Sequence, residues 1–72
     1  MNFSIHGEYI ELCRLLKAAN LVMSGSEGKE VVAENLVSVD GQIETRKRCK
    51  IRSGQTVEFA GRMINVVASD PS

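Results

Sequence analysis

The sequence of 72 residues contains few aromatic side chains, and they are Phe3, Tyr9 and Phe59. It has no tryptophan and a single proline. A hydrophobic core built from this sequence must therefore be aliphatic. Proteins that read single-stranded RNA on a sheet stack the bases on exposed aromatic residues, so the shortage argues against that class of reader.

The sequence also lacks a long hydrophobic run and a signal peptide. No apolar stretch approaches the ~20 residues that cross a bilayer. The N-terminus, MNFSIHGEYIE, has no basic start followed by an apolar segment. We therefore expect a cytoplasmic protein without a membrane partner. Cys13 and Cys49 lie far apart with no metal-ligand spacing around them, so we expect reduced thiols instead of a disulfide.

Patterns typical of catalysis are missing as well. His6 is the only histidine, and we interpret it as a surface or packing residue because no serine, cysteine or carboxylate is arranged around it. Neither cysteine has the neighbours that activate a nucleophile, and no spacing suits a metal ion. We predict that the protein is not an enzyme and has no catalytic residues, metal site, cofactor or small-molecule substrate.

Charge is unevenly distributed along the chain, although the formal net charge is zero. Residues 1–45 carry three bases and seven acids, whereas residues 46–72 carry six bases and two acids. Such a split indicates a charged partner for one face of the molecule. The densest cluster of one sign comprises Arg46, Lys47, Arg48, Lys50 and Arg52.

Two helices are predicted in the first half of the chain, which we expect to form one domain, residues 1–72. Residues 8–19 form the first, because Tyr9, Leu12, Cys13, Leu16 and Ala19 share one helical face. Ser24 and Glu27 match a capping box, which predicts a second helix over residues 25–34. Gly28 inside it indicates close approach of another backbone or ligand, or simply a weak point. Asn35 suits a left-handed helix stop.

A β-hairpin is predicted directly after the second helix. Residues 37–39 alternate as a strand, and Asp40-Gly41 is a strong hairpin signal, so residues 42–45 would return antiparallel. A strict two-residue turn pairs Ile43 with Ser38 and places Ile43 on the face opposite the valines. Either the sheet is apolar on both sides there, or a bulge shifts the register.

A second hairpin is predicted over residues 56–59 and 62–67, about Ala60-Gly61, and residues 68–72 form a polar tail. Residues 3–5 alternate and suggest a short edge strand or an extended arm. The expected fold is therefore α+β, with two helices packed on a small, mostly antiparallel β-sheet.

The basic cluster follows the first hairpin and has two interpretations. On an extended segment, every second side chain points to one side, which would align Arg46, Arg48, Lys50 and Arg52. Their ~6–7 Å spacing matches the interval between phosphates along a nucleic-acid strand. Mutual repulsion favours a polyanionic partner. Alternatively, the charges protect a solvated edge strand from aggregation.

The start of the second helix is another candidate contact. Ser24, Gly25 and Ser26 place free amides at a helix N-terminus, which is a general anion site, and Lys29 lies one turn further along. Glu27 opposes this interpretation, and an ordinary helix cap explains the same residues. Residues 25–28 also satisfy the GxxG of a KH domain, but the inner serine and glutamate make that match weak.

The order of these elements resembles the S4-type RNA-binding domain, also called the αL motif. The resemblance covers about residues 9–67, and its most specific part is LLKAANLVMSGSEGKEVVAENLVSVDGQIETRKRCKIRSGQTV. It is most similar to small stand-alone bacterial members, whose second helix begins Ser-Gly. Gly25 stands where many members have arginine, which implies weaker or different RNA contact. Asn35 and Asp40 replace the usual glycine and asparagine, and both still suit turns.

The resemblance implies a monomeric RNA-binding protein that contacts structured ribosomal or transfer RNA. The implied contacts are the end of the first helix, the start of the second, and the basic edge after the hairpin. The expected RNA-binding residues are Lys17, Ser24, Gly25, Ser26, Lys29, Arg46, Lys47, Arg48, Lys50 and Arg52. The alternative is a protein-interaction module that uses the same basic edge strand.

Overall fold

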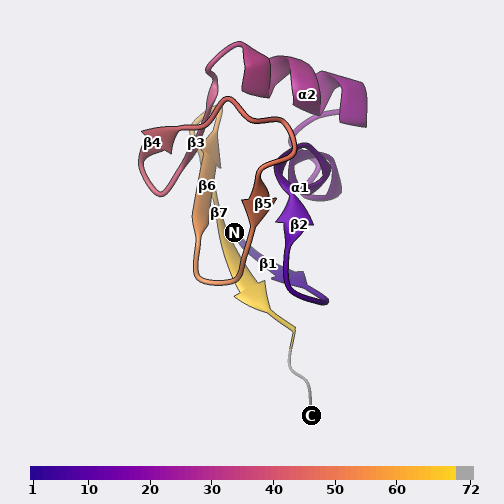
Figure 1. Cartoon of the computed structure of the whole chain (residues 1–72), viewed down its shortest axis with the longest axis vertical. Helices are drawn as coiled ribbons and strands as arrows, with labels where there is room; N and C mark the ends of the chain where they lie inside the picture. The colour runs from indigo at the N-terminus through magenta and orange to yellow at the C-terminus, as the bar shows by residue number, and fades with distance from the viewer. Residues whose placement is uncertain (70–72) are drawn as a thin grey trace.

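The computed structural model describes residues 1–69, which form two helices and two β-sheets (Figure 1). No helix in this part of the chain has the length and apolar character needed to cross a membrane. In chain order the elements are β1 (Asn2–Ile5), β2 (Ile10–Glu11), α1 (Leu12–Ala18), α2 (Gly25–Ala33), β3 (Val37–Val39), β4 (Gln42–Ile43), β5 (Lys50–Ile51), β6 (Thr56–Phe59) and β7 (Arg62–Ala68).

The larger sheet has five strands in the order β1-β7-β6-β3-β4. Its neighbours are antiparallel except for β1 and β7, which run parallel. A second sheet pairs β2 with β5 in antiparallel orientation. The α+β fold expected from the sequence is therefore confirmed, and residues 3–5 belong to an edge strand.

One aliphatic core joins the helices to the inner face of the large sheet. Leu12, Leu15 and Leu16 of α1 are fully buried, as are Ile51 and Ile64 of the strands. The helices pack closely on each other where Gly28 of α2 meets the main chain of α1. A Cβ added to Gly28 would lie 2.8 Å from the carbonyl oxygen of Cys13. Of the two explanations for this glycine, the structure supports close approach of another backbone.

The first helix is shorter than the sequence pattern predicts. It begins at Leu12, not at residue 8, because Ile10 and Glu11 pair with Ile51 and Lys50 as β2 and β5. The chain then enters the helix with the amide of Leu12 donating to the carbonyl of Cys49 at 2.9 Å. Strand pairing with a distant segment thus overrides the local helical periodicity.

The second helix matches its predicted start. The Ser24 hydroxyl accepts the amide of Glu27 at 3.1 Å. The other half of the predicted capping box differs, because the Glu27 carboxylate accepts the amide of Met23, not that of Ser24.

Both helices end in left-handed asparagines. Asn35 has φ of 63°, and the amide of Leu36 donates to the carbonyl of Val31 at 3.2 Å, as in a Schellman motif. Asn20 ends α1 in the same way, with φ of 62°.

Both hairpins turn where the sequence predicts. Asp40 and Gly41 have φ of 51° and 84°, the positive values of a type I′ turn. Ser38 pairs with Ile43 without a bulge, so Ile43 faces away from the core and is 59% exposed. The returning strand ends at Ile43 instead of residue 45.

The second hairpin runs further than predicted. Val57 pairs with Ile64 as expected, and Ala60-Gly61 forms the turn. β7 continues to Ala68, and the amide of Ser69 donates to the carbonyl of Ile5 at 2.9 Å. The first two residues of the predicted polar tail are therefore ordered against β1, and residues 70–72 lie outside the described residues.

Candidate nucleic-acid interface

The segment between β4 and β5, residues 44–49, carries the first three cations of the cluster and is here called the basic loop. It is not extended. The amide of Cys49 donates to the carbonyl of Arg46 at 3.1 Å, which closes a turn at Lys47 and Arg48. The predicted alignment of alternate cations along a strand is therefore wrong for Arg46 and Arg48.

The bend has a tertiary cause. The loop carbonyls of Lys47 and Cys49 accept the amides of Cys13 and Leu12 at 3.2 and 2.9 Å. These are among the first amides of α1, which have no partner inside the helix. Covering the start of α1 requires the loop to fold over it, and Figure 1 shows the loop passing along α2 towards α1.

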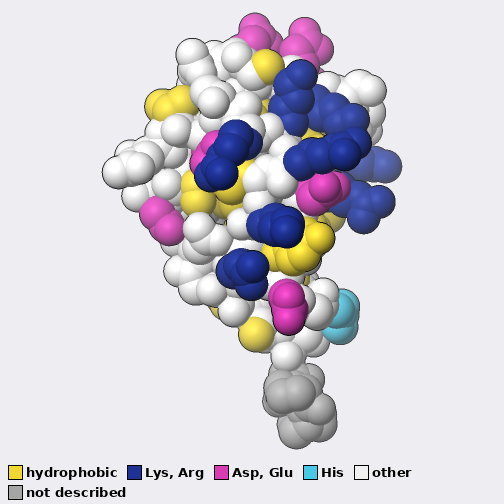
Figure 2. Space-filling view, viewed as in Figure 1, with side chains coloured by type: hydrophobic (Ala, Val, Ile, Leu, Met, Phe, Trp, Pro, Cys, Tyr) yellow, Lys and Arg dark blue, Asp and Glu magenta, His cyan; other side chains and the backbone are white. Residues whose placement is uncertain are grey.

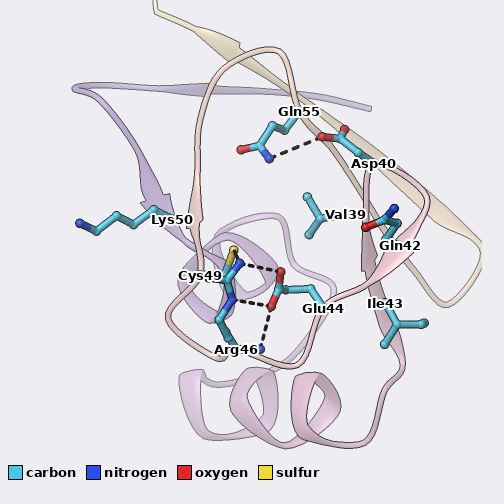
Figure 3. Close-up of a pocket in the computed structure, with 9 residues that line it drawn as sticks. All are labelled: Val39, Asp40, Gln42, Ile43, Glu44, Arg46, Cys49, Lys50 and Gln55. Carbon is cyan, nitrogen blue, oxygen red and sulfur yellow. Dashed lines mark hydrogen bonds and ion pairs between the residues drawn. The ribbon is translucent and has the colours of Figure 1, made fainter.

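Arg46 is held within the loop by Glu44. Its Nε lies 2.9 Å from Glu44 Oε2 and its Nη2 lies 3.2 Å from Oε1 (Figure 3). This hydrogen-bonded pairing lowers the pKa of the Glu44 carboxyl from 4.5 to about 2, and it raises the pKa of the Arg46 guanidinium. The first base of the cluster thus has an acidic partner two residues before it, which the sequence interpretation did not assign.

Cys49 lies on the other side of the Arg46 guanidinium, with Sγ 3.7 Å from Nη2. Burial, followed by the nearby Glu44 carboxylate, raises the pKa of the Cys49 thiol. Cys13 is buried, and both cysteines are free thiols as expected. Within residues 1–69, no three histidine, cysteine or acidic side chains cluster closely enough to hold a metal ion.

Arg48 lines a shallow pocket with Arg46, Cys49 and Lys50, and it also lines a groove at the start of α2. This groove of about 430 Å³ lies between the two helices and the loop. It is lined by Glu11, Cys13, Arg14, Ser24, Gly25, Ser26, Lys29 and Arg48. The structure therefore brings together the start of the second helix and one cation of the basic cluster, which the sequence presented as separate candidates.

The other expected residues do not line this groove. Lys17 is exposed on the last turn of α1, and Lys47 is exposed at the loop turn. Lys50 belongs to β5 and Arg52 follows this strand, and the side chain of Lys50 points away from the Glu44–Arg46 pair in Figure 3. Figure 2 shows the dark-blue side chains gathered over one face of the molecule.

Sequence reasoning missed Arg14. This residue is absent from the expected RNA-binding residues, yet Arg14 lines the groove together with Lys29 and Arg48. The signal that could have found it is its position: once α1 begins at Leu12, Arg14 falls in the first turn, beside the segment that covers the helix start.

The sequence and the fold can be compared with those of known proteins. The family model described as "S4 domain" matches residues 3–67. The chain belongs to the S4 domain family. Its match covers the core, both helices and the basic loop, and it begins earlier than the resemblance seen in the sequence, because β1 is part of the match.

Two curated relatives support this membership. "Putative RNA-binding protein YbcJ" of Escherichia coli (strain K12) is 55% identical over 60 residues, covering 83% of this chain and 86% of that protein. "Uncharacterized protein YbcJ" of Shigella flexneri matches to the same extent. The solution structure of YbcJ from E. coli, described as an αL motif involved in RNA binding, superposes with a TM-score of 0.73 at 51% identity. The superposition covers 93% of this chain and 86% of the YbcJ chain.

Proposed function

We propose that this chain binds structured RNA, ribosomal or transfer RNA, as a monomer and without catalysis. The observation that carries the proposal is the groove in which Arg48 lies beside the start of α2. Support also comes from YbcJ of E. coli, whose structure is described as an αL motif involved in RNA binding.

The groove offers two kinds of phosphate contact. Arg14, Lys29 and Arg48 supply positive charge from three segments of the chain. The amides at the start of α2 supply hydrogen-bond donors, because the first turn of a helix leaves them unpaired inside the helix. The Glu27 carboxylate is hydrogen-bonded to the amide of Met23, which gives this acid a partner outside the groove.

Around the groove, the remaining cations extend the contact along a backbone. Lys47 and Arg52 are exposed on one side, and Lys17 continues the surface of α1. The Arg46 guanidinium is already paired with Glu44. It can therefore bind a phosphate either through the N–H groups that Glu44 does not use, or by leaving Glu44 for the phosphate. Contacts of this kind position a protein on RNA without reading its bases.

The direct test is RNA affinity measured across salt concentration, with a transfer RNA as the first probe and a ribosomal RNA fragment as the second. About five phosphate contacts predict a log–log slope of about −3 to −4 with the single-strand coefficient. The double variant Arg46→Glu with Arg48→Glu should bind much more weakly. Arg62→Glu is the control for one such charge reversal outside the groove, because Arg62 is exposed on β7 and does not line the groove.

A slope near zero, or equal binding by the double variant, would contradict RNA binding by this face. Recovery of protein partners after nuclease treatment, with no binding to either RNA, would instead favour a protein-interaction module on the basic edge.

A further inference from the structure

Tyr9 is the aromatic side chain that this molecule exposes on its basic face. The sequence pattern placed it on the buried face of a helix, but it precedes β2 and is 41% exposed. Phe3 and Phe59 differ, because both are partly buried and pack against the core. The Tyr9 ring is therefore accessible to a partner, whereas the other two rings are largely taken up by the core.

One cation of the basic cluster lies over this ring. The Nζ of Lys50 is 5.0 Å from the ring centroid. Lys50 belongs to β5, which pairs with the strand that directly follows Tyr9, with Glu11 opposite Lys50. The pairing of the two strands therefore brings the ring to the basic cluster.

A second groove runs from the ring towards the first one. It has a volume of about 400 Å³ and is lined by Tyr9, Ile10, Glu11 and Arg14. Glu11 and Arg14 also line the groove at the start of α2. An RNA backbone held near Arg48 and Arg14 would thus pass within reach of the Tyr9 ring.

We propose that Tyr9 stacks on an unpaired base of the bound RNA, next to the backbone contacted by the basic loop and α2. The inference rests on the proposed function and adds to it the kind of RNA. Paired bases of an A-form helix stay within their own stack, so only an unpaired base from a loop, a bulge or a single-stranded end can reach an aromatic ring. One exposed ring can stack on one base, so the expected partner is a structured RNA with a local unpaired nucleotide.

Lys50 has a defined part in this site. Its ammonium group over the ring attracts the ring's negative face and keeps the side chain oriented. The same positive charge lies beside the phosphate of any nucleotide that stacks there. The competing explanation is that ring and ammonium only pack on each other, in which case removing the ring would affect all RNAs equally or none.

The chain contains one tyrosine and no tryptophan, so its intrinsic tyrosine fluorescence reports on Tyr9 alone. The probes are an RNA hairpin with an unpaired adenosine loop, a blunt duplex of the same stem sequence, and inorganic polyphosphate. We expect the hairpin to quench the fluorescence at saturation, because stacking brings a base onto the ring. Polyphosphate and the blunt duplex should leave it nearly unchanged.

Variants at the same position provide an independent measurement. Tyr9→Leu should weaken binding of the hairpin about 5- to 100-fold, the usual effect of losing one stacked base. It should leave the affinity for polyphosphate and the salt slope unchanged. Tyr9→Phe keeps the ring and should bind the hairpin as the wild type does. Thermal unfolding of each variant establishes that the fold is intact.

The possible results separate this inference from the proposed function. The hairpin could bind with a steep salt dependence but cause no quenching, or it could bind Tyr9→Leu with full affinity. Either result overturns the stacking site and leaves the proposal of RNA binding intact. Equal quenching by hairpin and polyphosphate also overturns it, because charge alone would then explain the signal. Failure of every RNA to bind overturns both proposals.

Discussion

The carboxylate of Glu44 holds Arg46 by both its side chain and its backbone. Besides the two guanidinium contacts, Glu44 Oε2 accepts the amide of Arg46 at 3.0 Å. The Glu44 side chain is 18% exposed, whereas that of Arg46 is 76% exposed, so the acid is anchored and the base faces solvent. Glu44 therefore sets the point at which the chain leaves β4 and enters the basic loop.

This pairing predicts a pH-dependent contribution to stability. Folding lowers the pKa of Glu44 from 4.5 to about 2, so its contribution is complete above about pH 5 and is lost as the pH falls towards 2. Glu44→Gln should lower the melting temperature by about 1–4 °C at neutral pH, as expected for an exposed pair. That difference between the two proteins should shrink at pH 3 and vanish near pH 2. A difference that stays constant with pH would contradict the pairing.

Removing one phosphate contact should change the salt dependence by a defined amount. Arg48→Gln takes away a groove cation that has no salt bridge within residues 1–69. Its log–log slope for transfer RNA should be less steep than that of the wild type by about 0.7–0.9. Arg62→Gln removes the same charge from outside the groove and should leave the slope unchanged. Equal effects of the two variants would show that only net charge matters.

Gly25 offers a test by gain of function. It lines the groove, and a Cβ built on it meets nothing within 4 Å, so a longer side chain has room. Gly25→Arg should bind transfer RNA about 5-fold more tightly at low salt, because it adds one cation beside the start of α2. Gly25→Ala is the matched control and should bind as the wild type does. No gain by the arginine variant would show that the RNA does not approach this position.

Gly28 should not tolerate a side chain, although it lies in the same helix. An added Cβ would lie 2.8 Å from the backbone oxygen of Cys13, and a backbone atom cannot simply rotate away. We expect Gly28→Ala to lower the free energy of unfolding in urea by about 1–3 kcal/mol despite the better helix propensity of alanine. Gly25→Ala, in open space, should be as stable as the wild type. Equal stability of both variants would mean that α1 and α2 separate without penalty.

Much of the fold could be read from short-range signals. The cap at Ser24 and the stop at Asn35 bound α2, and the Asp40-Gly41 turn gives the direction and register of the first hairpin. Each of these depends on residues within a few positions of one another. These caps and turns can therefore be predicted from the sequence, because the groups that interact in each of them are neighbours in the chain.

The start of α1 and the shape of the basic loop could not be read in that way. Residues 8–11 have a helical pattern, but pairing of Glu11 with Lys50 draws the end of that segment into a strand. The loop bends because its carbonyls accept the first amides of α1, so residues 44–49 do not form an extended strand. Both outcomes depend on contacts between segments that are distant in the chain.

The sequence by itself determined the elements of α2, the hairpin turns and the concentration of positive charge after residue 45. Tertiary structure alone decided that Arg48 and Gly25 line one groove, that Glu44 holds Arg46, and that Tyr9 is exposed beside Lys50. The physical reason is the range of the interactions. Turns and caps are closed by neighbouring residues, whereas the groove exists only where packing of the core brings two helices and a loop together.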